Sequence, residues 1–359
     1  MKLLTIIGAR PQFIKAAAVS REISKHREIK EIIVHTGQHF DANMSDIFFE
    51  EMNIPLPHYR LDINSLSHGA MTGRMMEEIE RIMLKEHPDY TLVYGDTNST
   101  LAGALAAKKL HCKVVHIEAG LRSFNMTMPE EVNRILTDRI SDVLFCPTDM
   151  AVENLRKEGF EHFSCSIVQC GDVMEDAALY YADIAENRSN ILSNLGLCTN
   201  GYILATIHRA ENTDDASRLT RITNALNKIH KAIPVVIPLH PRTQKLLVQH
   251  ELTLDVITID PVGYLEMILL IKNARLVMTD SGGLQKEAFF FNKFCVTLRE
   301  ETEWIELVTH GYNKLAGTDE EKIEAYTTFF LDSPFVKRHS FYGGGKASEV
   351  IVQTLQKGL

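Results

Sequence analysis

The 359-residue sequence contains little cysteine, no long hydrophobic run and no excess of positive charge. Its six cysteines are scattered without a C-x-x-C pair, and no H-E-x-x-H motif accompanies its fifteen histidines, so we assign no metal site. No apolar run approaches the roughly 18 residues of a membrane-spanning helix, and no charged leader precedes the first apolar segment. We therefore expect a cytoplasmic protein with reduced thiols that neither enters a membrane nor is exported.

Acidic residues outnumber basic ones, 47 to 38, which gives a formal net charge of −9. Nucleic-acid binding needs a clustered excess of lysine and arginine, so we expect no nucleic-acid partner, although one local anion pocket is compatible with this charge. The glycine patterns of dinucleotide-binding and Walker loops are missing, which argues against a nicotinamide dehydrogenase and against ATP hydrolysis. Nucleophilic hydrolysis has no support either, because no G-x-S-x-G elbow is present.

The composition that is present suits a large buried core, with 45% hydrophobic and 24% charged residues. A single core usually stops growing near about 250–300 residues, so two domains are the default for this length. Short apolar runs alternate with longer helical patterns twice along the chain, which is typical of parallel α/β sheets. We expect strands at residues 3–7, 32–34, 90–94, 113–117 and 143–145, and again at 202–206, 234–239, 256–259, 276–279 and 294–297.

The predicted organisation is two doubly wound, Rossmann-type α/β domains with a cleft between them. We place the boundary near Gly171, which gives an N-terminal domain of residues 1–170 and a C-terminal domain of residues 171–345. Because the carboxyl ends of parallel strands face one crevice, residues that follow strands are the candidates for a site.

The first strand ends in a turn, Gly8-Ala9-Arg10-Pro11, that has the outline of an anion site. Proline suits the first turn of a helix, and the free N–H groups and dipole of a helix start favour phosphate. Arg10 can bind phosphate through two nitrogens, and Lys15 lies one turn into the helix. The alternative is an ordinary solvated turn between a strand and a helix.

A second turn of this kind follows residues 276–279 and includes Ser281, Gly282 and Gly283. Two glycines let a diphosphate approach the backbone, and Ser281 could contact it. Glu287, one turn into the following helix, is suited to accept hydrogen bonds from two ribose hydroxyls. The alternative is an N-capped packing turn.

Three carboxylates, Asp96, Glu118 and Glu130, follow predicted strands or begin a predicted helix. Asp96 and Glu118 should approach each other at the carboxyl edge of the sheet. Crowded carboxylates repel, which raises the pKa of at least one of them and prepares a base beside an acid. The alternative is that each carboxylate caps a helix.

Cationic residues accompany these carboxylates in both halves. Arg134 follows Glu130 by four residues, so either a helical ion pair or a phosphate contact would explain it. His208 and His240 both end predicted strands, where a protonated imidazole could stabilise a leaving diphosphate. A structural role is the alternative for each histidine.

Taken as a set, these residues resemble the non-hydrolysing UDP-N-acetylglucosamine 2-epimerase family over nearly the full length. The resemblance rests on the order and spacing of Gly8-Ala9-Arg10-Pro11, Gly37-Gln38-His39, Gly95-Asp96-Thr97, His116-Ile117-Glu118-Ala119-Gly120-Leu121-Arg122, Pro129-Glu130-Glu131-Val132-Asn133-Arg134, His208-Arg209, Asp280-Ser281-Gly282-Gly283 and Glu303. It implies a GT-B-like fold in which the C-terminal helix, about residues 346–359, packs back on the first domain. It also implies a homodimer.

The family resemblance implies inversion at C2 of a UDP-2-acetamido sugar, by anti elimination of UDP and readdition to a 2-acetamidoglucal, with no cofactor. By motif position, Asp96, Glu118, Glu130 and His208 would be catalytic. The diphosphate and ribose would be bound by Arg10, Lys15, Arg134, Ser281, Gly282, Gly283 and Glu287. Contacts to the sugar or behind these residues would come from Gln38, His39, Arg122, Arg209, His240, Arg299 and Glu303.

Two features separate this chain from the substrate-activated bacterial members. Asp41 stands where those members have a second glutamine, and their nearby arginine is not evident, so activation by substrate is not expected. Segments 36–45, 260–265 and 302–304 look closer to a branch that epimerises UDP-2,3-diacetamido-2,3-dideoxyglucuronate for surface polysaccharide. That uronate needs one further cation, for which Arg74, Arg122 and Arg209 are candidates.

Other functions remain open at this point. UDP-N-acetylglucosamine itself could be the substrate. A GT-B glycosyltransferase or a hydrolysing epimerase would bind the nucleotide similarly, and a non-catalytic sensor could bind it without needing three carboxylates.

Overall fold

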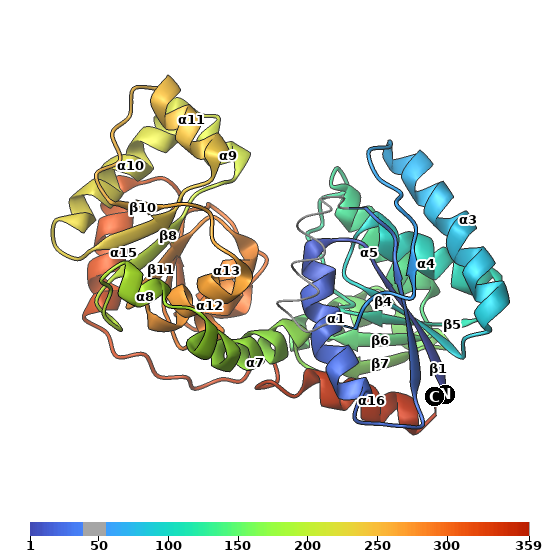
Figure 1. Cartoon of the computed structure of the whole chain (residues 1–359). Helices are drawn as coiled ribbons and strands as arrows, with labels where there is room; N and C mark the ends of the chain where they lie inside the picture. Colours follow the sequence, from blue (N-terminus) through green and yellow to red (C-terminus); the bar gives the residue numbers. More distant parts are fainter. Residues whose placement is uncertain (39–54, 359) are drawn as a thin grey trace. The chain divides into compact units, whose positions relative to one another are not determined.

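A computed structural model describes residues 1–38 and 55–358 and divides into two compact units (Figure 1). Unit 1 comprises Met1–Ala177 and Ser340–Leu359, and unit 2 comprises Ala178–His339. Helix α7 (Val173–Arg188) crosses the boundary between them, seven residues beyond the position near Gly171 that the sequence suggested. Within the described ranges, no helix is long and apolar enough to cross a membrane.

Unit 1 contains a seven-stranded parallel sheet in the order β3-β2-β1-β4-β5-β6-β7. Its strands are β1 (Lys2–Ile7), β2 (Lys30–His35), β3 (Tyr59–Arg60), β4 (Tyr90–Tyr94), β5 (Lys113–Ile117), β6 (Val143–Cys146) and β7 (Ser166–Gln169). Its helices are α1 (Arg10–Ile23), α3 (His68–Glu86), α4 (Asn98–Lys109), α5 (Pro129–Ile140), α6 (Asp149–Lys157) and α16 (Ala347–Gln356), with a short 3₁₀ helix at Phe160–His162.

Unit 2 contains a six-stranded parallel sheet in the order β10-β9-β8-β11-β12-β13. Its strands are β8 (Ile203–Thr206), β9 (Val235–Pro238), β10 (Ile257–Ile259), β11 (Leu276–Thr279), β12 (Cys295–Thr297) and β13 (Asn313–Leu315). The helices are α8 (Ile191–Asn194), α9 (Ala210–Thr213), α10 (Ala216–His230), α11 (Pro241–Gln249), α12 (Tyr264–Asn273), α13 (Gly282–Phe290), α14 (Ile305–Thr309) and α15 (Glu320–Leu331).

Both sheets reverse their strand order once, between β1 and β4 in unit 1 and between β8 and β11 in unit 2. The central strands are buried along nearly their whole length, so both faces of each sheet must be covered by helices. Right-handed crossovers place the connections on opposite faces at each reversal. Each reversal therefore leaves a crevice beyond the carboxyl ends of two neighbouring strands.

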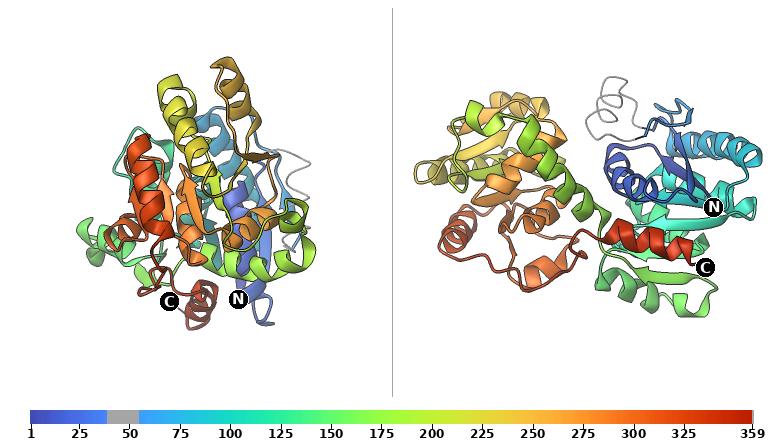
Figure 2. Two further views of the ribbon diagram at one scale, coloured as in Figure 1. Left: turned by 90° about the vertical axis from the view of Figure 1, so that its left-hand side faces the viewer. Right: turned by 60° about the horizontal axis from the view of Figure 1, so that its bottom comes forward.

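The C-terminal helix α16 returns to unit 1, where it packs beside α1 (Figure 2). Its start is capped by Asp176 of α7, whose carboxylate accepts hydrogen bonds from the Ala347 and Ser348 N–H groups at 3.0 and 2.7 Å. A carboxylate at this position satisfies donors that the helix itself leaves unpaired.

Three strands, β3, β7 and β13, were not expected from the sequence. All three lie at sheet edges, contain two to four residues and carry polar side chains, so they lack the apolar run that marks a buried strand. The two doubly wound parallel sheets themselves confirm the expected fold class.

Candidate active site

A pocket in unit 1 lies at the reversal between β1 and β4. It is lined by residues from the turns after these strands and from the start of α5, and by Gln38, which follows β2. Lys15, Asp96, Glu130 and Asn133 are among its lining residues. Residues that the sequence placed on separate turns thus share one pocket.

Gln12 fastens the two turns that border this pocket. Its side-chain oxygen accepts hydrogen bonds from the Gly8 and Ala9 N–H groups at 2.8 and 3.0 Å, and its nitrogen donates to the Tyr94 carbonyl at 2.8 Å. The sequence argument assumed that the N–H groups of this turn were free for phosphate, which is wrong for Gly8 and Ala9. Arg10, the first residue of α1, is only partly buried and stays a candidate anion-binding residue of the turn.

Lys15, which lines the pocket, forms an ion pair with Glu118. The two side chains are only 10% and 12% exposed, so little solvent screens this pair. Glu118 has a left-handed backbone with φ of 74°, and a Cβ atom on Gly95 would lie 3.1 Å from its Oε2. Gly95, itself at φ 62°, therefore leaves the room in which the Glu118 carboxylate sits.

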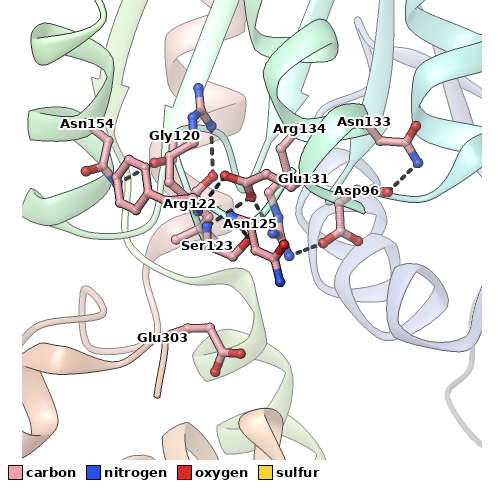
Figure 3. A network of polar contacts seen from close by, with 12 residues as sticks. Asp96, Gly120, Arg122, Ser123, Asn125, Glu131, Asn133, Arg134, Asn154 and Glu303 are labelled. Carbon is pink, nitrogen blue, oxygen red and sulfur yellow. Dashed lines mark hydrogen bonds and ion pairs between the residues drawn. The ribbon is translucent and has the colours of Figure 1, made fainter. Parts of the chain in front are cut away.

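Asp96 forms an ion pair with Arg134 of α5, at 2.5 Å between Oδ2 and Nη2 (Figure 3). Arg134 also donates to Glu131 at 2.9 Å, and the fully buried Glu131 carboxylate accepts the N–H groups of Ser123 and Phe124 at 2.9 Å each. Burial alone would lower the pKa of Arg134, but the Asp96 and Glu131 carboxylates outweigh burial and raise it. Arg134 thus stays charged beside Asp96.

These contacts revise three expectations. Arg134 pairs with Asp96 and Glu131, not with Glu130. Asp96 does not cap the following helix, because Thr97 occupies the N-cap position and accepts the Thr100 N–H. The charge crowding expected between Asp96 and Glu118 is offset, because each of them has its own cation.

Glu130 differs from the other two carboxylates. It lies in the first turn of α5, is exposed, and lines the pocket. Among residues 1–38 and 55–358, its carboxylate has no hydrogen-bond or ion-pair partner. Glu130 is consequently the one carboxylate of the three that no cation of the described residues neutralises.

Arg122 lies in a buried network behind the pocket turns. Its guanidinium, 1% exposed, donates to Asp138 at 2.7 Å and to both Glu158 oxygens at 2.7 and 2.8 Å. Burial would lower the pKa of Arg122, but Glu158 and Asp138 together raise it. These bonds occupy the guanidinium, which favours a role for Arg122 behind the pocket turns over contact with the sugar or the uronate.

In unit 2, the buried Asp280 organises the turn after β8. Its carboxylate accepts the His208 N–H at 3.0 Å, the Arg209 N–H at 3.0 Å and the Asn212 amide at 3.2 Å. The His208 ring, 49% exposed, lies with Nδ1 3.4 Å from Asp280 Oδ1. Asp280 therefore fixes the backbone that presents the His208 side chain.

Two arginines flank Glu303 in unit 2. Arg299 binds its carboxylate through two nitrogens at 2.9 and 3.1 Å, and Arg209 Nη2 lies 4.0 Å away. Burial would raise the pKa of Glu303, but the Arg299 hydrogen bonds and charge lower it. Trp304, next to Glu303, donates its indole N–H to the Gly282 carbonyl at 2.9 Å.

Helix α13 begins at the glycine turn after β11. Ser281 occupies the N-cap position, but its side chain makes no hydrogen bond to the first turn of the helix, so it does not act as the capping group that the alternative required. Gly283 is exposed, whereas Glu287 is buried on the second turn. The N-terminus of α13 therefore has an open glycine surface of the kind that accommodates phosphate.

His240 fits the catalytic prediction less directly. Its Nδ1 accepts the Arg242 N–H at 3.2 Å and so caps α11, which favours the structural alternative for this residue.

Gln38 lines the unit 1 pocket and accepts hydrogen bonds from Ser99 N and Oγ at 3.0 and 2.7 Å. His39 and Asp41 lie outside the described residues.

Comparison with known proteins agrees with this arrangement. The family model described as UDP-N-acetylglucosamine 2-epimerase matches residues 21–356. The chain belongs to this family. It is therefore an isomerase of the sugar-nucleotide 2-epimerase class with a GT-B-like fold.

Among its relatives, the UDP-2,3-diacetamido-2,3-dideoxy-D-glucuronate 2-epimerase of Pseudomonas aeruginosa is 58% identical over 99% of this chain and 100% of its own length. The UDP-N-acetylglucosamine 2-epimerase of Methanocaldococcus jannaschii is 44% identical over the full length of both chains. The crystal structure of the M. jannaschii protein with UDP-GlcNAc and UDP superposes with a TM-score of 0.86 over the whole of both chains.

In this epimerase-family chain, sequence reasoning missed Gln12, Glu131 and Asp280 as residues that hold the site together. Each stands inside a motif that was noticed, directly after a strand or in the first turn of a helix. Their position in the sequence could have identified them as candidates. Their hydrogen-bond partners could not have been identified, because side-chain bonds between distant turns depend on the folded sheet.

Proposed function

We propose that this epimerase-family protein acts on UDP-2,3-diacetamido-2,3-dideoxyglucuronate and inverts its C2 centre. The observation that carries the proposal is the unit 1 pocket. It is lined by Glu130, which has no cation among the described residues, and by Asp96 and Lys15, which pair with Arg134 and Glu118. The choice of substrate is supported by the 58% identity to the P. aeruginosa enzyme of that name.

The reaction consists of an elimination and its reversal. A carboxylate takes the proton from C2, the C–H electron pair forms the C1=C2 double bond, and the C1–O bond breaks so that its electrons leave with UDP. UDP oxygen then attacks C1 of the 2-acetamidoglucal while a carboxylic acid returns a proton to the opposite face of C2. No net oxidation occurs and no cofactor is consumed.

Unit 1 supplies the acid and base in this proposal. A base must lie close to the proton that it removes, and Glu130 is an exposed carboxylate that lines the pocket and has no cation among the described residues. Asp96 is paired with Arg134, and Glu118 is paired with Lys15. Each cation can offset negative charge or hold its carboxylate in one rotamer. Together they provide acid and base groups for both faces of C2.

Unit 2 supplies diphosphate-binding groups in addition to Arg10, Lys15 and Arg134 of unit 1. His208, oriented by Asp280, is suited to donate a proton or hydrogen bond to the leaving diphosphate. The glycine turn at the start of α13 would take phosphate, and Glu287 would accept from ribose. Arg209, 36% exposed at the edge of the Glu303 cluster, is our candidate cation for the uronate carboxylate.

Incubation in deuterated water tests this function directly. We expect proton NMR to show solvent deuterium at C2, with UDP still attached, when UDP-2,3-diacetamido-2,3-dideoxyglucuronate is supplied. UDP-N-acetylglucosamine run in parallel tests the substrate: faster exchange with it would transfer the proposal to that sugar nucleotide. The absence of exchange with both would refute a 2-epimerase reaction.

The same experiment separates the remaining alternatives. Accumulation of free UDP with a reducing sugar would indicate a hydrolysing epimerase, and transfer to an added acceptor would indicate a glycosyltransferase. Binding without any turnover would indicate a sensor. We further propose that the protein is a cytoplasmic homodimer that supplies surface-polysaccharide precursors. Size-exclusion chromatography with light scattering tests whether it is a dimer.

A further inference from the structure

A fully buried histidine lies directly behind the pocket turns, and the reaction above makes no use of it. His116 belongs to β5, two residues before Glu118, and its side chain is 0% exposed. Its Nδ1 lies 2.6 Å from Asp138 Oδ1 and its Nε2 lies 2.7 Å from the Gly95 carbonyl oxygen. Both ring nitrogens therefore face hydrogen-bond acceptors.

This geometry gives each ring nitrogen a partner. A backbone carbonyl cannot donate, so Nε2 donates its N–H to Gly95. Nδ1 faces the Asp138 carboxylate, which Arg122 also holds at 2.7 Å. Burial would raise the pKa of Asp138, but the charges and hydrogen bonds of His116 and Arg122 outweigh burial and lower that pKa.

The pair joins the segments that carry two of the three proposed catalytic carboxylates, Asp96 and Glu118. Gly95, whose carbonyl binds His116, directly precedes Asp96. The second oxygen of Asp138 accepts the Gly120 N–H at 3.1 Å, two residues after Glu118. A change at His116 or Asp138 would therefore move both segments without touching the substrate.

We propose that His116 and Asp138 are positioning residues that fix Asp96 and Glu118 relative to each other for proton transfer at C2, a role that rests on the proposed function. A buried ion pair that served packing alone would stabilise the fold and leave the turnover of folded protein unchanged. The positioning role instead requires that the Gly95 bond itself control turnover.

Two substitutions at His116 separate its two bonds. The amide of His116→Gln can reach the position of Nε2 and keep the bond to Gly95, whereas the shorter amide of His116→Asn can reach only the position of Nδ1 and keep the bond to Asp138. Thr137→Val is the matched control, because Thr137 is the neighbour of Asp138 on α5 and its buried hydroxyl has no hydrogen-bond partner in the described chain. The melting temperature verifies that each variant folds. UDP binding, measured by the fluorescence of the single tryptophan, Trp304, provides a second check of folding.

We expect His116→Asn to lower kcat by about 10²-fold with KM and UDP affinity within about threefold of wild type, because a displacement near 1 Å costs this much. His116→Gln should recover most of the loss, and Thr137→Val should match wild type. Equal kcat for folded His116→Asn, His116→Gln and Thr137→Val would overturn the positioning role. If His116→Asn does not fold, Asp138→Asn takes its place against Thr137→Val, with an expected loss of about tenfold in kcat, and equal values again overturn the role.

Failure of the proposed function gives a different result. A wild-type protein that exchanges no C2 proton with either sugar nucleotide would refute the reaction, and the positioning role would fall with it. A wild type that exchanges normally, with variants that do the same, would refute the positioning role alone.

Discussion

The two units reverse their strand order in the same way but differ in charge at the turns after β4 and β5 of unit 1 and after β8 of unit 2. Unit 1 carries Asp96 and Glu118 after β4 and β5, each held by a cation from a helix. Unit 2 carries the basic side chains of His208 and Arg209 after β8, and the buried Asp280 holds their backbone. The same scaffold thus presents acidic side chains in one unit and basic side chains in the other.

Removing single charges from unit 1 should produce the largest effect. We expect Asp96→Asn or Glu118→Gln to lower kcat by about 10²–10⁴-fold, because acid–base groups contribute this much to proton transfer. UDP affinity, measured by Trp304 fluorescence, should change less than about threefold, because neither carboxylate is among the residues expected to bind the nucleotide. If both variants instead lost UDP binding, the assignment of these carboxylates as acid and base would be wrong.

Alanine substitutions at the glycines that follow β1 and β11 provide a second test of the difference between the two units. A Cβ atom on Gly8 would lie 2.0 Å from Thr36 Oγ1 and 2.3 Å from Ser99 Oγ, so Gly8→Ala should destabilise the fold by about 1–3 kcal/mol through overpacking. On Gly282 the nearest atom would be Glu303 Oε2 at 3.5 Å, which is ordinary contact.

Gly282→Ala should therefore leave the free energy of unfolding within about 0.5 kcal/mol of wild type while it weakens UDP binding about tenfold, because the methyl group opposes close approach of phosphate. Denaturant unfolding and fluorescence titration measure the two effects. A stable Gly8→Ala, or a Gly282→Ala with unchanged UDP affinity, would show that the two turns do not differ in this way.

The sequence predicted the strands of the two sheets better than the side-chain bonds between distant segments. Runs such as residues 3–7 and 90–94 are apolar because central parallel strands are buried on both faces, so the run itself predicts the strand. The edge strands β3, β7 and β13 lack that burial and lack the signal. Short segments at a sheet edge become strands only because a neighbouring strand is there to pair with them.

The same limit applies to the site. Asp96, Glu118 and Glu130 were identified because each follows a strand or begins a helix, which sequence order reveals. The pairing of Lys15 with Glu118 joins residues 103 positions apart, and that of Arg134 with Asp96 joins residues 38 apart. Helical spacing favoured Glu130 as the partner of Arg134, but the neighbouring sheet positions supplied a better one.

Acid should affect the buried network of unit 1 in a defined direction. The pKa of Asp138 lies below its ordinary value of about 3.9, because His116 and Arg122 outweigh the effect of burial. A carboxyl group with a lowered folded-state pKa stabilises the protein fully above its unfolded-state pKa and loses this contribution as pH falls through the folded-state value.

The difference in melting temperature between wild type and Asp138→Asn should therefore be greatest near pH 6 and shrink below about pH 4. Calorimetry at stepped pH values measures it. A difference that stays constant down to pH 3 would mean that the Asp138 carboxylate does not carry the charge inferred for it.

The smallest effect should come from an ion pair of unit 2 that lies in solvent. Arg242 and Asp214 approach to 2.6 Å, but their side chains are 52% and 53% exposed, so water and salt screen their attraction. We expect Arg242→Gln to change the free energy of unfolding by less than about 0.5 kcal/mol, as is usual for exposed pairs. Denaturant unfolding at low and high salt provides the measurement, with Asp138→Asn in unit 1 as the buried counterpart. A loss at Arg242 as large as the loss at Asp138 would mean that burial does not distinguish the structural charges of unit 1 from the surface charges of unit 2.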